Sequence, residues 1–150
     1  MPVLTCDILI ENLHKDALFE WLGNLQNHIP FLAHAFDSVV QNPESFMLAI
    51  STPIKTYYLE YALDKKDDEY SGKRIRIKTM GKRGSGQMNF SLRTMKPSRN
   101  TMLTITWDYS PGSVLGFLLN KAFFEDIYMK AIQDIVQHIQ QNKDSIPTPD

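Results

Sequence analysis

The sequence has little from which cross-linked or membrane-spanning structure could be built. It contains one cysteine, Cys6, so no internal disulfide bond can form, which fits a reducing compartment. Its longest apolar runs fall far short of the roughly 18 residues that a membrane-spanning helix needs. The N-terminal segment MPVLTCDILI lacks the basic region, apolar run and small-residue cleavage site of a signal peptide. We therefore expect a cytoplasmic location.

The chain also lacks any strong excess of charge. Its formal net charge is −1, so no overall charge attracts nucleic acid or a membrane. The eight Phe, six Tyr and two Trp argue against a disordered chain, which would be poorer in aromatic residues. A length of 150 residues favours one domain. We expect that domain to span residues 1–144 and the tail, residues 145–150, to be frayed.

Motifs for metal binding or catalysis are absent as well. The four histidines, His14, His28, His34 and His138, show no metal-ligand spacing, and His34 would meet Asp37 only if the chain turned between them. The glycine-rich run at residues 81–86 is no P-loop, because it joins two predicted strands rather than a strand and a helix. We expect surface or core histidines, no metal and no cofactor.

What the sequence does contain is a series of alternating segments. Apolar residues recur at every second position, as expected for strands with one buried face. The charged residues 64–70 and the glycine-rich residues 81–86 are expected to be hairpin connections. The predicted strands cover residues 3–10, 35–41, 46–50, 55–63, 72–80, 88–92 and 103–109.

Helical spacing appears in three places. Two short helices are predicted after the first strand, one over residues 14–24 with Asn12 as a possible cap, and one carrying Phe31 and Leu32 with Asn27 as its cap. Residues 111–142 form the longest helical segment. Its two apolar stripes are displaced by roughly a third of a turn, which indicates either a break near residues 120–126 or a strongly curved surface beneath it. We favour the break, with a short helix that ends near Lys121 and a long helix from about Phe124 to Gln141.

A helix that is apolar on one side needs a partner, because packing supplies most of its stability. The predicted strands of the middle of the chain provide that partner. We therefore predict an α+β domain in which a curved antiparallel sheet wraps around a long C-terminal helix, with two short helices between the first two strands. A cavity between sheet and helix would be the functional site.

The end of the chain adds a resemblance. The last predicted strand leads into a proline–glycine turn and a leucine-rich patch, formed by Pro111, Gly112, Leu115, Gly116, Leu118 and Leu119. With the order of elements, this pattern resembles the START-like, or SRPBCC, superfamily with its helix-grip fold, which includes polyketide cyclases/dehydrases and lipid-transfer proteins. The resemblance implies a cavity for an apolar or amphipathic small molecule. It implies no catalytic residue, because the superfamily shares none.

Large aromatic and methionine side chains fall on the candidate inward faces. Such side chains suit an irregular apolar ligand, although they also build ordinary cores. The candidate ligand-binding residues are Tyr57, Tyr61, Met88, Phe90, Trp107, Tyr109 and Phe123. The favoured hypothesis is binding or transport of a lipid-like, quinone-like or polyketide-like molecule. A cyclase- or dehydrase-like enzyme, or an interaction module whose pocket has collapsed, remains an alternative.

The most pronounced cluster of charge is basic. Arg74, Arg76 and Lys78 share one strand face, and Lys73, Lys82 and Arg83 lie beside them in sequence. Nucleic acid is not expected as a partner, because the aromatic residues of the neighbouring strands alternate to the opposite face. We expect a solvated outer face, with weak contact to an anionic membrane surface as the alternative. The sequence leaves the oligomeric state open.

Overall fold

The computed structural model describes the backbone of residues 3–51, 56–69, 72–81, 84–95, 100–110 and 114–146. Within these ranges, it describes the side chains of residues 3–51, 56–68, 72–81, 86–95, 100–108 and 125–146. Among the helices of these residues, none is both long and apolar enough to cross a lipid bilayer.

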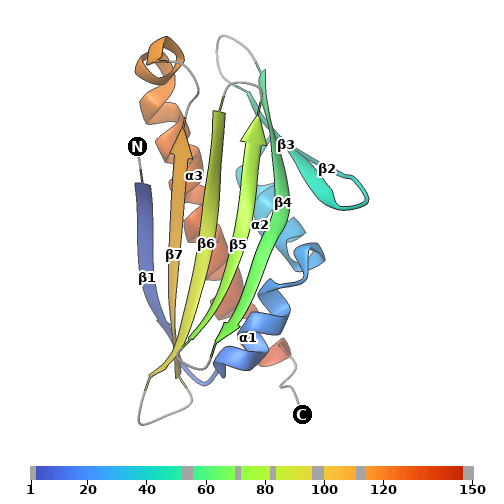
Figure 1. Ribbon diagram of the computed structural model, residues 1–150, viewed down its shortest axis with the longest axis vertical. Coiled ribbons are helices and arrows are strands. Elements are labelled where there is room, and N and C mark those ends of the chain that lie inside the picture. Colours follow the sequence, from blue (N-terminus) through green and yellow to red (C-terminus); the bar gives the residue numbers. More distant parts are fainter. Residues whose placement is uncertain are drawn as a thin grey trace.

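The order of elements agrees with the predicted α+β class. The first strand is followed by a helical segment, then by six strands and a long helix (Figure 1). The elements are β1 (Val3–Ile10), α1 (Lys15–Leu22), the short 3-10 helix η1 (Leu25–His28), α2 (Ile29–Ala35), β2 (Ser38–Gln41), β3 (Ser45–Ser51), β4 (Thr56–Glu69), β5 (Gly72–Gly81), β6 (Gly84–Met95), β7 (Asn100–Ser110), α3 (Val114–Asn142) and the 3-10 helix η2 (Lys143–Ser145).

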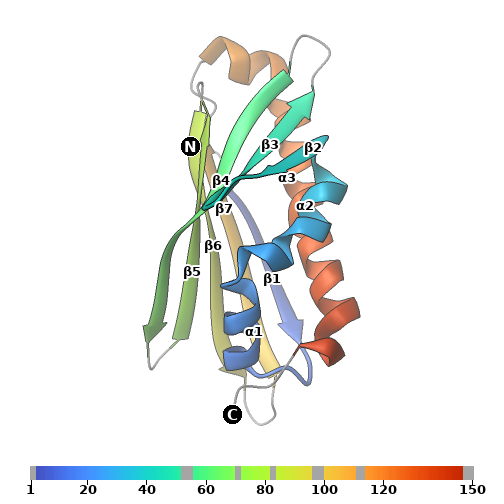
Figure 2. The ribbon, with the colours of Figure 1, turned by 90° about the vertical axis from the view of Figure 1, so that its right-hand side faces the viewer.

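The strands form one antiparallel sheet in the order β1-β7-β6-β5-β4-β3-β2. The first strand pairs with the last, so that Leu4 lies opposite Trp107. The helical segment α1–η1–α2 carries the chain from β1 to the far edge of the sheet, where β2 lies. Figure 2 shows the sheet from its side, curving around α3, with all helices on its concave face. The predicted helix-grip arrangement is therefore present.

Alternation along the strands decides which residues form the core. In β5, Ile75, Ile77 and Thr79 are buried beneath the helices, while the intervening basic residues are exposed on the outer, convex face. The helix α3 contributes Ile132, Ile135 and Ile139, which recur at helical spacing and are fully buried against the concave face. This burial supplies the packing that neither the sheet nor the helix has alone.

The prediction that the charged residues 64–70 form a loop is wrong for residues 64–69, which the structure describes. β4 continues through these residues to Glu69, and a shift of register between Leu63 and Lys65 marks a β-bulge. A bulge reverses the alternation of side chains beyond it, so Lys66 lies opposite the buried Ile75. Cross-strand ion pairs, including Lys73–Asp68 at 3.1 Å, help to keep this charged segment in the sheet.

The predicted break in the C-terminal helix is also wrong. α3 is one continuous helix from Val114 to Asn142. Figure 2 shows that its first part runs in a different direction from the remainder, so the helix bends rather than ends. A bend allows one continuous helix to follow a curved surface. The proline–glycine turn, Pro111 and Gly112, lies outside the described residues.

The predicted helix caps are each displaced along the chain. Asn12 does not cap α1 but adopts a left-handed conformation with a φ of 60°, which asparagine tolerates. His14 is the cap, because its Nδ1 accepts a hydrogen bond from the Asp16 amide at 3.1 Å. Asn24 caps η1 in the same way. Asn27 instead donates its side-chain amide to the Trp21 carbonyl at 2.9 Å.

Candidate ligand-binding site between the sheet and the C-terminal helix

The predicted ligand-binding residues that can be placed all lie on or beside the concave face. Tyr61, Met88, Phe90 and Trp107 are fully buried there, and Tyr57 is half-buried. The register of β6 and β7 sets Met88 beside Trp107. The side chains of Tyr109 and Phe123, which were also predicted to bind ligand, lie outside the described residues. The structure therefore places the five described residues of the set on or beside one face, while their role in binding stays a prediction.

Trp107 lies at the contact between the sheet and two helical elements. The ring of Tyr128, from α3, stacks on the indole with 4.4 Å between ring centroids and 28° between planes. Phe36, directly after α2, approaches with a centroid distance of 6.5 Å. Trp107 is 0% exposed, and its Nε1 atom has no hydrogen-bond partner among the described residues. A buried donor without an acceptor is unfavourable, so this N–H requires an explanation.

A second polar group is buried deeper under the helices. His28, at the end of η1, is 0% exposed, with its Nδ1 2.8 Å from the Tyr61 hydroxyl and its Nε2 2.7 Å from the Leu22 carbonyl oxygen. A carbonyl can only accept, so Nε2 carries the proton and Nδ1 accepts the hydrogen bond that Tyr61 donates. The rings of Phe31 and Phe90 lie 5.1 and 5.9 Å from the imidazole.

Burial controls the ionisation of this pair. It disfavours the charged imidazolium and lowers the pKa of His28 from 6.5 to about 4, although the hydrogen bond to Leu22 opposes that shift. Burial also raises the pKa of the Tyr61 hydroxyl well above its ordinary value. Both side chains are therefore neutral near pH 7. Sequence patterns could not identify the pair, because its members are 33 residues apart and in different elements.

The end of the concave face beside α1 is charged. Lys73 was grouped with the outer basic residues, but its side chain is 13% exposed and points inward, with Nζ 2.7 Å from Asp16 and 3.1 Å from Asp68. Burial opposes the charge of Lys73, but hydrogen bonds to the two carboxylates outweigh this and raise its pKa. The hydrogen bond from Lys73 lowers the pKa of Asp16. The ammonium also lies over the Phe19 ring, 4.9 Å from its centroid.

The described residues supply no obvious catalytic or metal centre. No group of three or more His, Cys, Asp or Glu side chains among them could hold a metal ion. His34 does not meet Asp37: its Nδ1 lies 2.8 Å from Asp134 on α3, and Asp37 accepts from the Ser51 amide at 2.6 Å. Cys6 is half-buried, and burial raises the pKa of its thiol. A thiol in that state is a poor nucleophile.

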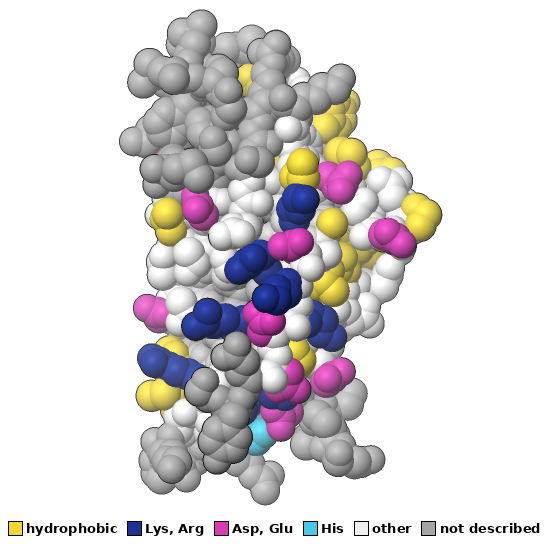
Figure 3. Space-filling view, viewed as in Figure 1, with side chains coloured by type: hydrophobic (Ala, Val, Ile, Leu, Met, Phe, Trp, Pro, Cys, Tyr) yellow, Lys and Arg dark blue, Asp and Glu magenta, His cyan; other side chains and the backbone are white. Residues whose placement is uncertain are grey.

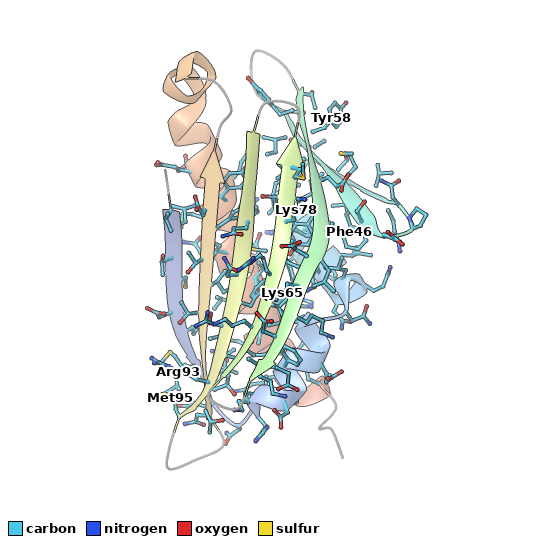
Figure 4. The ribbon with its side chains drawn as sticks, in the orientation of Figure 1. Phe46, Tyr58, Lys65, Lys78, Arg93 and Met95 are labelled. Carbon is cyan, nitrogen blue, oxygen red and sulfur yellow. The ribbon has the colours of Figure 1, made fainter. Side chains whose placement is uncertain are left out.

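The outer face of the sheet carries the basic row, Arg74, Arg76 and Lys78. All three side chains are exposed as predicted, and Figure 4 labels Lys78 together with Lys65 on the neighbouring strand. Figure 3 shows acidic side chains between the basic ones on this face. Arg76 lies 3.9 Å from Asp64, so part of the charge is balanced locally. Lys82 and Arg83 lie outside the described residues.

Solved structures of other proteins have the same architecture. A START superfamily protein from Mycobacterium smegmatis matches with a TM-score of 0.63 and 7% identity, over 97% of this chain and 99% of its own. Norcoclaurine synthase from Thalictrum flavum, in complex with dopamine and hydroxybenzaldehyde, matches with a TM-score of 0.65 and 8% identity, over 99% of this chain and 89% of its own. A protein from Thermus thermophilus matches with a TM-score of 0.66 and 11% identity, over 98% of this chain and 100% of its own. The chain has the START-like (SRPBCC) fold.

No protein-family model and no curated protein sequence matches the chain. At 7–11% identity the solved structures establish the START-like fold and no shared residue function. The resemblance inferred from the strand order and the C-terminal segment is confirmed at that level. Within this START-like fold, Trp107, His28 and Tyr61 are each 0% exposed, as is Thr101, whose hydroxyl donates to the Leu13 carbonyl at 2.6 Å.

Proposed function

We propose that the protein binds an apolar or amphipathic small molecule between the concave face of the sheet and α3, without covalent chemistry. One observation carries the proposal. The indole N–H of Trp107 is fully buried on the concave face and has no acceptor among the described residues. Buried donors are nearly always satisfied, so a bound molecule that supplies an acceptor would account for this one.

The surroundings of Trp107 suit an uncharged, largely apolar occupant. Its described neighbours include Leu4 and Met88 on the two adjacent strands and the rings of Tyr128 and Phe36. Methionine and aromatic side chains adapt to the shape of apolar ligands and give large contact areas. The complex of norcoclaurine synthase, which has the same fold, holds the small aromatic molecules dopamine and hydroxybenzaldehyde. Lipid-like, quinone-like and polyketide-like molecules all fall within this class.

A cyclase- or dehydrase-like enzyme is supported less well. Catalysis by proton transfer needs a group that can reach the substrate and change its protonation near the working pH. The candidate base, His28, has both ring nitrogens engaged, one by Leu22 and one by Tyr61. Its pKa of about 4 keeps it neutral, and its surroundings are aromatic. We therefore favour carriage or sequestration over turnover.

Two measurements test the proposal. Native mass spectrometry of the protein purified from its own host should show an added mass in the range of a small lipid or quinone. The neutral dye N-phenyl-1-naphthylamine should gain fluorescence on binding, and a displacing ligand should reverse the gain. A folded, stable protein that carries no added mass and binds no dye would support the interaction-module alternative instead.

A matched pair of variants locates the binding site. Met88→Trp adds bulk beside Trp107 on the concave face, whereas Gln87→Trp adds the same side chain to the neighbouring outward position. We expect Met88→Trp to abolish dye binding and Gln87→Trp to preserve it. Circular dichroism and thermal unfolding check that both variants fold. Equal dye binding by the two variants would place the dye elsewhere on the protein.

A further inference from the structure

The chemistry around Trp107 also restricts what its ligand can be. We propose that the ligand is a neutral molecule with an oxygen acceptor, such as a ketone, quinone or ester carbonyl, which receives a hydrogen bond from the Trp107 indole. The inference rests on the proposed binding function and deepens it. It has two parts, namely that the acceptor is required and that it carries no charge.

The ligand needs an oxygen acceptor because the Trp107 indole N–H is held in a fixed position. Tyr128 stacks on the indole at 4.4 Å, and Phe36 approaches at 6.5 Å, so rings from α3 and from the end of α2 restrict the orientation of the indole. The side chain is 0% exposed, so its N–H does not reach bulk water. A ligand without an acceptor would leave this donor unsatisfied, whereas a carbonyl oxygen would satisfy it at no cost in reorganisation.

The ligand should carry no charge because the described charged side chains of the concave face lie far from Trp107. In the described part of the concave face, charged side chains gather beside α1, where Lys73 pairs with Asp16 and Asp68. Lys73 lies opposite Leu92, and Leu92 lies opposite Leu103, which precedes Trp107 by four residues along β7. Four residues of strand span roughly 13 Å. A ligand carboxylate at the Trp107 nitrogen would therefore be buried without a counter-charge from the described residues, which is strongly unfavourable.

Two compounds of nearly the same shape test the requirement for an acceptor. In 2-acetylnaphthalene a carbonyl oxygen occupies the place of the terminal methylene of 2-isopropenylnaphthalene. The ratio of their dissociation constants is measured by calorimetry or dye displacement for the wild type and for Trp107→Phe, which keeps an aromatic ring but removes the N–H. Because both proteins are tested with the same two compounds, the difference in hydrophobicity between the compounds cancels when the wild-type ratio is compared with that of Trp107→Phe. We expect the preference for the ketone to fall about tenfold in the variant.

Further controls separate the possible outcomes. Trp21→Phe removes the other indole, which stacks on His138, and should leave the preference unchanged. The anion 2-naphthoate should bind at least about tenfold more weakly than the ketone. If Trp107→Phe does not fold, the indole N–H signal of the wild type in nitrogen-15 NMR serves instead, and it should move downfield with the ketone and not with the hydrocarbon.

The failure of this inference is distinguishable from failure of the proposed function. If both neutral compounds bind, but with the same preference in wild type and Trp107→Phe, the acceptor requirement is overturned and the binding function stands. The same holds if 2-naphthoate binds as tightly as the ketone, which would overturn the requirement for neutrality. If neither neutral compound binds to the wild type, the binding function itself is overturned together with this inference.

Discussion

The Nδ1 atom of His28 lies 2.8 Å from the hydroxyl oxygen of Tyr61, and this contact ties the helical segment to the sheet. On its other side the imidazole donates to the carbonyl of Leu22, the last residue of α1. One buried ring at the end of η1 therefore joins α1 to β4. Removing either side-chain partner would leave a buried polar atom unsatisfied, which typically costs about 1–3 kcal/mol.

The first prediction is that this pair makes the fold sensitive to acid. The pKa of His28 is about 4 in the folded protein, against 6.5 when it is unperturbed. The unfolded chain therefore takes up the proton first as the pH falls. The resulting loss of stability begins near pH 6.5, grows down to about pH 4 and then levels off, at about 3 kcal/mol. Urea unfolding at a series of pH values measures this loss.

Variants attribute the acid sensitivity to one side chain. His28→Gln should be less stable than the wild type at pH 7, because it disturbs a buried network, but its stability should change less between pH 6.5 and 4. An unchanged slope in His28→Gln would show that other groups cause the acid sensitivity.

Much of the fold could be predicted because one physical signal determines it. Residues such as Ile75 and Ile77 alternate with Arg74 and Arg76, and a sheet with one buried face requires that alternation. The long helix could be predicted for a similar reason, since Ile132, Ile135 and Ile139 recur at helical spacing. These patterns are local, so no knowledge of distant contacts was needed.

The remaining features depend on contacts that a local pattern does not contain. The bulge after Leu63 reverses the inward face of β4, and it lies within the charged residues that were mistaken for a loop. The ion pairs that hold Lys73 inward join β5 to α1 and β4, so they could not be predicted from β5 alone. The His28–Tyr61 bond and the Trp107–Tyr128 stack each join distant elements. Their partners have no fixed spacing in the chain. The aromatic candidates could be chosen from their residue type and from the alternation of the strands. The polar partner of Tyr61, His28, could not be chosen in this way.

A second prediction concerns the ion cluster at the α1 end of the sheet. Lys73→Met should lower the free energy of unfolding by about 1 kcal/mol, because the two carboxylates lose a largely buried partner. Lys78→Met, on the exposed face of the same strand, is the matched control and should change it less. Equal effects of the two variants in chemical unfolding would mean that burial adds nothing to the Lys73 contacts.

The same cluster gives a pH dependence of its own. The hydrogen bond from Lys73 holds the pKa of Asp16 below 3.8, so the folded state stabilises the carboxylate. This contribution is present above the unfolded pKa and is lost as the pH falls through the folded value. Asp16 is partly exposed, so solvent and salt screen the effect. Asp16→Asn should flatten the stability profile below pH 4, and raised salt should reduce the difference.

A third prediction concerns the basic row. Replacing Arg74, Arg76 and Lys78 together by glutamine should change stability little, because exposed charges contribute ~0–1 kcal/mol each. We further propose that any binding of this face to anionic vesicles is weak and salt-dependent, since Asp64 offsets part of the charge. Co-sedimentation with phosphatidylserine vesicles at low and high salt tests this. A loss of several kcal/mol in unfolding would contradict the exposed placement of the row.

The last prediction uses Trp107 to distinguish a ligand site from an ordinary core. In a filled core, Trp107→Ala should cost ~3–5 kcal/mol, because burial is lost and a cavity remains. If a ligand occupies part of the space, the ligand-free protein should lose less and the variant should lose affinity instead. With Trp21→Phe as background, only Trp107 fluoresces, and its burial beside Tyr128 predicts a blue-shifted emission that responds to a bound ligand. Emission typical of indole in water, unchanged by every apolar compound, would remove Trp107 from the site, and the proposed cavity with it.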